Sequence, residues 1–385
     1  MKYLRNKKKI QKIEILKVYR FFKIYGVRKT LFKIAGRARG KSKLLTILLR
    51  SKKKNPDIGV IGCGQFTYST VGQVISSNYG NRFLDCYDID TQAADTFADF
   101  YQINHHSLDS KSIFDNEQVK YVYIASNHAS HTDYAIEALS KNKIVYLEKP
   151  IAVNRQQLSR LIRCVKNASK PIYVGYNRPF SKAILDLKTQ VLSNFDMPIT
   201  LNCFVTAHKL PSSHWYRDKN EGTRICGNVG HWIDLGVHIL SWTKLPDKWD
   251  IQVVTSNPLE ADDDISISLT SSRGDLIVFV ITSRSEPFEG INETINFQQG
   301  EVICKIDDFR LSTTWKNETL INKKYHPKDV GHNNSICQPF EEKYSREWNE
   351  VVKSSLLMLH IADMVKNSNK HSSFSFKDSI STINN

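Results

Sequence analysis

The stretch that decides the fold reads Asp57-Ile58-Gly59-Val60-Ile61-Gly62-Cys63-Gly64-Gln65-Phe66. Residues 58–61 form a short apolar run typical of a buried strand, and residues 65–77 are compatible with a helix. Between them, Gly62 permits a tight turn, and Gly64 lets the backbone approach a pyrophosphate seated on the helix N-terminus. We therefore predict a dinucleotide site in which Gln65 and Phe66 open the helix.

The residue that ends the second predicted strand, 83–87, is Asp88. A carboxylate there can accept hydrogen bonds from the adenosine ribose and would repel a 2′-phosphate. Neither Arg nor Lys follows in residues 89–91. These features favour NAD over NADP as the cofactor. The alternative for Asp88 is a helix cap or turn residue.

Strands and helices keep alternating, with strands expected at 121–124, 144–147 and 172–175 and helices at 131–140 and 155–167. This alternation predicts a doubly wound parallel sheet of the Rossmann type. The strand at 144–147 leads into Glu148-Lys149-Pro150. Because ligands bind beyond the carboxyl ends of such strands, we expect Lys149 to project toward the nicotinamide.

The second half of the chain favours a mostly antiparallel sheet. After a helix at 179–192, strands are expected at 199–205, 250–255, 265–269, 276–282, 293–297 and 302–306, followed by a helix at about 340–365. We therefore predict three parts: a basic helical extension with a linker (1–55), a Rossmann domain (56–178), and an α+β domain with an open sheet (179–385).

Two polar residues stand four apart in the stretch 227–238, namely Asp234 and His238. On a helix they would share one face, where a carboxylate can orient and charge an imidazole so that it acts as a base. The alternative is an ordinary satisfied pair. The loop before this helix holds Trp215, Tyr216 and Arg217, which suit sugar stacking and a phosphate or carboxylate contact, or simple loop packing.

The positive charge belongs to the N-terminal extension. Residues 1–54 contain 20 Lys or Arg against one acid, Glu14, whereas the rest has 34 basic and 38 acidic residues. Apolar residues recur there at helical spacing, and Gly26, Gly36 and Gly40 should divide the segment into short helices. Such a segment suits an anionic membrane surface. Nucleic-acid binding and docking on a partner subunit are the alternatives. Residues 52–56 are expected to be a linker, so removing residues 1–54 should leave the remainder active.

Seven scattered cysteines without a Cys-x-x-Cys pair argue for reduced thiols and against a zinc site, so no metal is expected. No secretory signal or run of ~18 apolar residues is present. We expect a cytoplasmic protein with peripheral contact at the inner face of the membrane.

The ordered motifs resemble the Gfo/Idh/MocA family, the oxidoreductases named for glucose-fructose oxidoreductase and inositol dehydrogenase. The matching pieces are the Gly62/Gly64 turn, Asp88, the Ser126-Asn127 loop with His131, Glu148-Lys149-Pro150, Val174-Gly175-Tyr176-Asn177-Arg178 and Gly230-His231-Trp232-Ile233-Asp234-Leu235-Gly236-Val237-His238. The resemblance implies that Ser126, Asn127, His131 and Glu148 join the cofactor site, with Arg178 and His231 near the substrate. It also implies that Lys149, Asp234 and His238 converge, and that the free face of the second sheet makes homo-oligomer contacts.

Two finer likenesses narrow the expected substrate. Residues 221–231 and 329–332 look like the branch of the family found in polysaccharide and lipopolysaccharide biosynthesis, whose substrates are nucleotide sugars or related glycosides. Thr67 departs from the family pattern where a small residue is usual, and Ser126-Asn127 replaces a frequent Thr-Pro. Neither departure changes a residue that we expect to act as acid or base.

The expected reaction is hydride transfer between a sugar carbon and nicotinamide C4. We expect His238 to be the leading base, Asp234 its orienting partner, and Lys149 the cation that steadies the oxyanion or relays the proton. Lys149 could itself be the base. Two alternatives stay open: an NAD-dependent glycoside hydrolase of the same fold, and a non-catalytic NAD-binding scaffold tethered by the basic extension.

Overall fold

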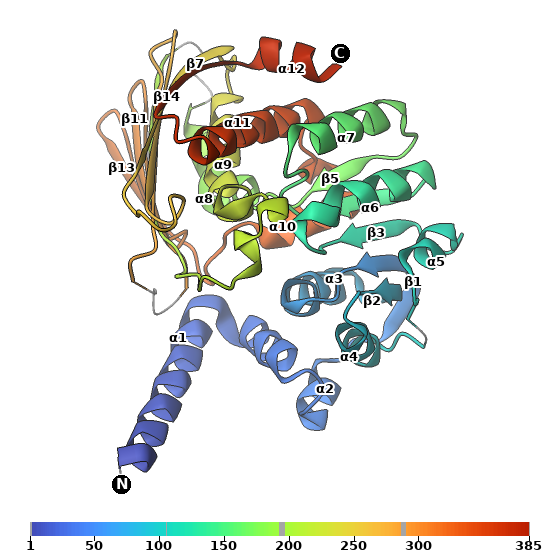
Figure 1. Cartoon of the computed structure of the whole chain (residues 1–385). Helices are drawn as coiled ribbons and strands as arrows, with labels where there is room; N and C mark the ends of the chain where they lie inside the picture. The colour runs from blue at the N-terminus through green and yellow to red at the C-terminus, as the bar shows by residue number, and fades with distance from the viewer. Residues whose placement is uncertain (1, 105, 192–196, 286–289, 385) are drawn as a thin grey trace.

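The computed structural model describes residues 2–104, 106–191, 197–285 and 290–384, with side chains described from residue 15 to residue 383. Two sheets stand side by side with helices between them, as Figure 1 shows. The first sheet is fully parallel, in the order β2-β1-β3-β4-β5. Its strands are β1 (Lys53–Ile61), β2 (Asn81–Tyr87), β3 (Tyr121–Ile124), β4 (Ile144–Leu147) and β5 (Ile172–Val174).

Helices connect these strands and cover both faces of the sheet. They are η1 (Thr67–Val71), α3 (Gly72–Tyr79), α4 (Thr91–Tyr101), α5 (Ser110–Asp115), α6 (His128–Ser140) and α7 (Arg155–Asn167). The first helix opens with a π-helical turn, η1, directly after the glycine turn. The predicted Rossmann architecture is confirmed, although α4 and α5 were not predicted.

The second sheet has nine strands in the order β13-β12-β11-β10-β6-β9-β8-β7-β14, and only its β6–β9 pair is parallel. Its strands are β6 (Ile199–Thr206), β7 (Lys248–Thr255), β8 (Ile265–Ser271), β9 (Leu276–Thr282), β10 (Asn292–Gln299), β11 (Val302–Asp307), β12 (Leu311–Lys316), β13 (Thr319–Lys324) and β14 (His371–Ser375). The mostly antiparallel open sheet is confirmed, and β12, β13 and β14 extend it beyond the prediction.

The remaining helices lie mainly between the sheets or cap their ends. They are η2 (Arg178–Phe180), α8 (Lys182–Val191), η3 (Trp215–Arg217), η4 (Lys219–Glu221), η5 (Ile225–Val229), α9 (Gly230–Leu240), α10 (His332–Cys337), η6 (Gln338–Phe340), η7 (Glu342–Tyr344), α11 (Trp348–Lys366) and α12 (Phe376–Asn384). The predicted helix at 340–365 therefore starts later, at Trp348. The predicted end of the helix before β6, Leu192, lies outside the described residues.

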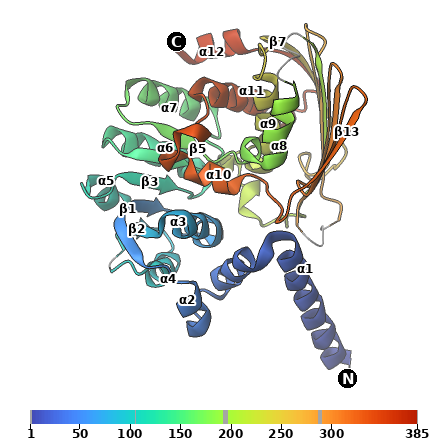
Figure 2. The same ribbon diagram turned by 180° about the vertical axis from the view of Figure 1, so that it is seen from behind.

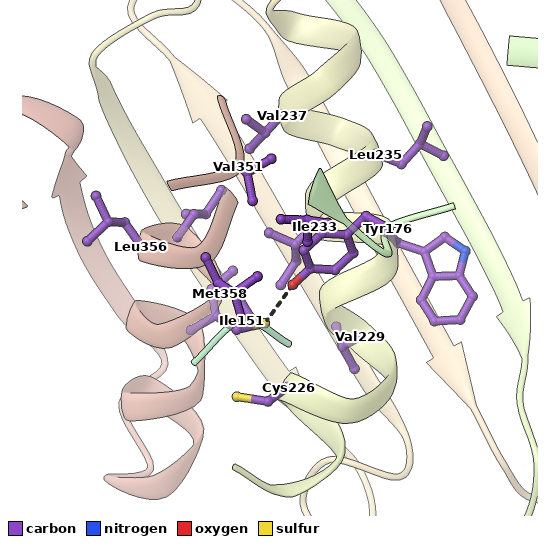
Figure 3. Packing of buried hydrophobic residues seen from close by; sticks show 14 of the residues in the cluster. Ile151, Tyr176, Cys226, Val229, Ile233, Leu235, Val237, Val351, Leu356 and Met358 are labelled. Atoms are coloured by element: carbon purple, nitrogen blue, oxygen red, sulfur yellow. Dashed lines mark hydrogen bonds between the residues drawn. The ribbon is translucent and has the colours of Figure 1, made fainter. Parts of the chain in front are cut away.

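The core of the second half forms where α9 packs between the second sheet and α11. Figure 3 shows this contact, with the Tyr176 side chain pointing from the end of the first sheet toward Met358 of α11. The Tyr176 hydroxyl donates to the Met358 sulfur at 3.7 Å. Gly236 allows the close approach of α9 to the sheet, because a Cβ there would lie 2.8 Å from the Phe279 ring. This packing fixes the helix that carries Asp234 and His238.

The N-terminal extension consists of α1 (Lys2–Ala38) and α2 (Lys43–Leu49). Gly26 interrupts α1 with a non-helical backbone (φ 81°, ψ 172°), and Gly40 follows its end, but Gly36 stays inside the helix. Before the kink, α1 projects away from the rest of the chain, and the two termini lie at opposite ends of the molecule in Figure 2. After the kink, Phe32 and Ala35 are buried in the same cluster as Tyr68, Phe97 and Phe100.

One expectation about this region was wrong. Residues 53–56, expected to be linker, are the beginning of β1, and Lys53 pairs with Asn81 of β2. Lysine side chains in solvent do not prevent their backbone from joining a sheet. Removing residues 1–54 would also expose the contact between Phe32 and Phe100, whose ring centroids lie 5.9 Å apart. No helix among the described residues is both long and apolar enough to cross a bilayer.

Candidate active site

The glycine turn has the shape that a dinucleotide requires. Gly62 has φ +91°, and a Cβ there would lie 2.5 Å from the carbonyl oxygen of Ala125, so no larger residue fits. Around Gly64, by contrast, nothing lies within 4 Å of the place a Cβ would take. That open space, at the start of a helix, fits the pyrophosphate of NAD, which would be held by backbone N–H groups of residues 64–66.

Asp88 lies beside this turn and is half-buried at the end of β2. Its Oδ2 accepts a hydrogen bond from Cys63 N at 2.6 Å, and its Oδ1 accepts one from Asp90 N at 2.9 Å. The cap of α4 is Asp90, whose side chain accepts from the N–H groups of Gln92 and Ala93. The helix cap is therefore Asp90, whereas the bond from Asp90 N to Asp88 Oδ1 is a turn contact, which fits the turn-residue alternative for Asp88. A contact of Asp88 with the adenosine ribose stays a prediction.

Lys149 follows β4 at the carboxyl edge of the same sheet, next to the buried Glu148. Its Nζ donates to the carbonyl oxygen of Gly227 at 2.9 Å, and its peptide bond with Pro150 is cis. Glu148 accepts a hydrogen bond from the Tyr146 hydroxyl at 2.9 Å, and burial raises the pKa of Glu148 to about 7. Lys149 thus joins the Rossmann sheet to the segment that leads into α9. Its convergence with Asp234 and His238 stays a prediction.

The loop before α6 is tied to η4 by Glu221, whose carboxylate accepts from Asn127 Nδ2 at 2.6 Å and from Ala129 N at 3.1 Å. The Ser126 hydroxyl lies 2.8 Å from that of Ser130. The His131 ring lies between the carbonyl oxygens of Pro150 and Ser126, at 2.9 and 3.1 Å, and burial lowers its pKa to about 4. These residues position the cofactor loop.

Asp234 and His238 share one face of α9, as their spacing predicted, but both are engaged with residues near the start of α11. Arg346 donates to both oxygens of Asp234, at 2.9 and 3.1 Å, and also donates to Glu350. Glu350 Oε1 lies 2.8 Å from His238 Nδ1, and Trp242 Nε1 lies 3.2 Å from His238 Nε2. Both ring nitrogens of His238 therefore have partners.

Burial governs the ionisation of this network. It raises the pKa of Asp234 against the opposing charge of Arg346, and it lowers the pKa of His238 against Glu350. For Glu350, burial is outweighed by the charges of Arg346 and His238, so its pKa falls to about 2. Among the described residues, no hydrogen bond or ion pair joins Lys149 to Asp234 or His238.

His231 lies two turns before His238 on α9 and differs from it in its surroundings. Its ring meets Tyr176 and Trp232 edge-on, at centroid distances of 6.0 and 6.1 Å, and neither nitrogen has a hydrogen-bond partner within the described part of the chain. Burial, followed by the charges of Arg178 and Lys149, lowers the pKa of His231. His231 is therefore a neutral imidazole with lone-pair capacity to spare.

The two predicted substrate-binding arginines are held in internal ion pairs. Arg178 contacts both oxygens of the buried Glu293, at 2.6 and 3.0 Å, and stacks over the Trp232 ring at 4.4 Å. Arg217 lies 2.9 Å from Asp263 and 3.1 Å from Glu260. These contacts fit the loop-packing alternative for Arg217.

Trp215 and Tyr216 pack against His128, at centroid distances of 4.6 and 4.8 Å. Trp215 keeps 44% of its surface exposed, so of the predicted loop residues it remains the most available to a ligand. No three His, Cys, Asp or Glu side chains gather as a metal site within the ranges that the structure describes.

Four acidic or basic partners were missed from the sequence: Glu221, Glu293, Arg346 and Glu350. The only local signal was the four-residue spacing of Arg346 and Glu350 within the expected helix at 340–365, which by itself indicates only a pair on one helix face. In the structure Arg346 precedes α11 and points back to α9.

Comparison with known proteins finds a family model and sequence relatives for the Rossmann domain. Residues 57–176 match the family model Gfo/Idh/MocA, described as "Oxidoreductase family, NAD-binding Rossmann fold". A protein named inositol 2-dehydrogenase from Ralstonia nicotianae is 28% identical over 164 residues, covering 40% of this chain and 46% of its own. "Oxidoreductase P35" from Formosa agariphila is 26% identical over 136 residues, or 35% and 42% of the two chains. The sequence match thus spans less than half the length of these relatives.

Solved structures extend the likeness of fold to the second domain. A structure described as a putative myo-inositol dehydrogenase from Sinorhizobium meliloti has a TM-score of 0.65 at 15% identity, covering 83% of this chain and 99% of the other. Levoglucosan dehydrogenase in complex with NADH and L-sorbose has a TM-score of 0.69 at 13% identity, with coverages of 83% and 98%. Residues 57–176 therefore match the NAD-binding Rossmann domain of the Gfo/Idh/MocA oxidoreductase family, and the solved structures extend the similarity of fold to most of the chain.

Proposed function

We propose that the protein is an NAD-dependent oxidoreductase that transfers a hydride between the cofactor and a hydroxyl-bearing or keto carbon of a sugar. The observation that carries this proposal is the position of Lys149, which extends from the carboxyl end of β4 to Gly227 at the start of the α9 segment. When bound, NAD supplies the hydride acceptor at nicotinamide C4. The protein must then hold the substrate oxygen and take its proton.

Lys149 is suited to hold the substrate oxygen, because an ammonium beside the reacting oxygen stabilises the negative charge that develops there. The only hydrogen bond of its ammonium among the described residues goes to the backbone carbonyl of Gly227. It can therefore donate its other protons to a ligand without breaking an ion pair.

The hydrogen-bond partners of the two imidazole rings favour His231 over His238 as the acceptor of the substrate proton. A general base must reach the hydroxyl with a free lone pair. His231 has one, whereas both nitrogens of His238 are occupied by Glu350 and Trp242. In this proposal, Asp234 and His238 position α9 through Arg346, and they would act on the substrate directly only if that network opened.

The proposed substrate is a nucleotide sugar or related glycoside used in surface-polysaccharide synthesis. The residues at 221–231 and 329–332, which resemble that branch of the family, adjoin the candidate cofactor site. Glu221 accepts a hydrogen bond from Asn127 in the loop before α6, and the ring centroids of His332 and Phe66 lie 5.7 Å apart. Names of relatives that refer to inositol and levoglucosan are consistent with a polyol or sugar ring as the reacting part.

The test is a panel of nucleotide sugars and free sugars monitored for NADH formation, with Lys149→Ala as the inactive variant and Lys141→Ala as a control on the exposed surface. Lys149→Ala is expected to lower turnover by ~100-fold or more with NAD binding near normal. Full activity in that variant would show that Lys149 has no role in catalysis. Release of a free sugar from a glycoside without net NADH would instead identify an NAD-dependent glycoside hydrolase.

We also propose that the extension contacts an anionic membrane at the inner face. Before the kink, α1 exposes apolar side chains on a helix rich in lysine and arginine; they are Ile15, Leu16, Val18, Tyr19 and Phe22. The short helix α2 exposes Leu44, Ile47 and Leu48. Exposed apolar residues among cations suit the boundary between headgroups and acyl chains.

A further inference from the structure

The N-terminal extension is bonded to the rest of the chain on both sides of its kink. Before the kink, the carbonyl oxygen of Ile24 accepts a hydrogen bond from Lys328 N at 2.8 Å, which joins α1 to the segment between β13 and α10. After the kink, α1 ends at Ala38, and Arg39 follows with a left-handed backbone (φ 42°). Because Phe32 is fully buried, the end of α1 is held in place and presents Arg39 to the glycine turn.

The Arg39 guanidinium contacts the glycine turn directly. Its Nη2 donates to the carbonyl oxygen of Cys63 at 2.9 Å. Its Nη1 donates to Thr96 Oγ1 of α4 at 3.2 Å, and the group lies over the Tyr68 ring, 4.8 Å from the centroid. These partners are all uncharged, and residues 62–66 contain neither Lys nor Arg. The extension therefore supplies the glycine turn with a cation that the turn itself lacks.

Cys63 is held at both of its backbone polar atoms by side chains of opposite charge. Asp88 Oδ2 accepts from the Cys63 N–H at 2.6 Å, and Arg39 donates to the Cys63 carbonyl oxygen. The Cys63 side chain is buried as well. Together these contacts fix the orientation of the peptide group between Cys63 and Gly64.

The orientation of this peptide group decides where the Gly64 N–H points. The bond is trans, and in a planar trans peptide the C=O and the N–H point in opposite directions. Because Arg39 holds the C=O of Cys63, the N–H of Gly64 points away from Arg39. Among the described residues this N–H donates no hydrogen bond, and Gly64 is exposed. A hydrogen bond to the C=O also polarises the peptide group and makes its N–H a stronger donor.

We propose that Arg39 is a positioning residue for the diphosphate of the cofactor. It orients and polarises the Gly64 N–H, which donates to a phosphate oxygen, and its positive charge favours the anion on the far side of the peptide group. Arg39 itself does not touch the diphosphate, because the peptide group stands between them. The inference rests on the cofactor part of the function proposed above and not on the identity of the sugar.

The experiment uses the full-length protein and the variant Arg39→Met, which keeps an aliphatic side chain over Tyr68 but removes the charge and the donors. Arg37→Met is the matched control, because Arg37 is an exposed arginine in the last turn of the same helix. Titration calorimetry measures the Kd of NAD and of ADP-ribose, which carry the diphosphate. A titration followed by NMR measures the Kd of adenosine, which has the same nucleoside without phosphate.

Arg39→Met should raise the Kd of NAD and of ADP-ribose about tenfold and change the Kd of adenosine less than about twofold. Arg37→Met should change every Kd less than about twofold. Arg39→Lys, which keeps the charge and one donor toward Cys63, should recover most of the loss. Arg39→Gln repeats the comparison with a second uncharged side chain and carries the test if Arg39→Met does not fold.

Unchanged affinity for NAD and ADP-ribose in the uncharged variants overturns the proposal. An equal loss of affinity for adenosine and for ADP-ribose also overturns it, because Arg39 would then only support the fold of the turn. These measurements need no turnover, so a failure of the proposed sugar oxidation would leave them valid. Conversely, dehydrogenase activity with unchanged affinities would reject the role of Arg39 and keep the proposed function.

Discussion

Two histidines of the same helix illustrate how far function depends on single-residue surroundings. His231→Gln is expected to lower turnover by ~100-fold or more, because it removes the proposed proton acceptor, while NAD binding stays near normal. His238→Gln should act mainly on stability, because it breaks contacts with Glu350 and Trp242. Steady-state kinetics and thermal melting of both variants separate the two roles. Loss of turnover in His238→Gln alone would identify His238, and not His231, as the base.

Arg346 supports two buried carboxylates, so its removal should be costly. Arg346→Leu leaves Asp234 and Glu350 without their shared cation, and breaking a buried pair in this way typically destabilises by about 3–5 kcal/mol. Urea denaturation at pH 7 measures the loss. An unchanged urea midpoint in this variant would show that the network contributes little to the free energy of unfolding.

The same substitution should change the dependence of stability on pH. The pKa of Glu350 is lowered to about 2 in the folded protein, so this group stabilises the fold above its unfolded pKa of about 4.3. That contribution is lost as pH falls toward 2. In Arg346→Leu the lowering charge is absent, and the fall in stability between pH 4.5 and 2 should be shallower than in the wild type.

At the scale of elements, the kink at Gly26 divides α1 into two parts with separate roles. Deleting residues 2–22 removes the exposed apolar side chains of α1 before the kink but retains Phe32, Ala35 and the exposed side chains of α2. We expect this variant to keep its NAD affinity and to bind vesicles of phosphatidylserine and phosphatidylcholine more weakly in a sedimentation assay. Vesicle binding equal to that of the full chain would exclude this part of α1 from the membrane contact.

Strong local patterns predicted most elements well. The strands at 121–124 and 144–147 have the predicted bounds, because parallel central strands are continuous apolar runs. The edge strand β13 was missed, since its side chains are exposed or only partly buried and carry little alternation. The start of β1 was missed because three consecutive lysines resemble a linker.

At the scale of the whole molecule, the outer face of the second sheet presents an apolar patch suited to a second copy of the chain. Trp315 pairs directly with Ile303 on one side and with Leu320 on the other, and all three are exposed. Leu320→Lys should convert an oligomer to monomer in analytical ultracentrifugation, whereas Leu108→Lys, an exposed leucine of the first domain, should not. A monomeric wild type would exclude this interface.

From the sequence, the residues of the candidate site could be predicted only as separate motifs along the chain. The glycine turn, Asp88 and Lys149 each follow a strand, so the parallel sheet alone brings them to one edge. The charged partners of Asp234 and His238, Arg346 and Glu350, each lie 112 positions away along the chain. No local spacing encodes those contacts, and they changed the proposed roles of His231 and His238.

The hydrogen bond from Lys328 to Ile24 also bears on how the chain is made. The carbonyl that accepts this bond leaves the ribosome some 300 residues before the amide that donates it. At about 5–20 residues per second, that interval is roughly 15–60 s. Throughout it, the part of α1 before the kink lacks its partner Lys328. An anionic surface near the ribosome would therefore meet this part of the extension before the second domain is complete, so the order of synthesis favours the proposed membrane contact first and the contact with Lys328 second.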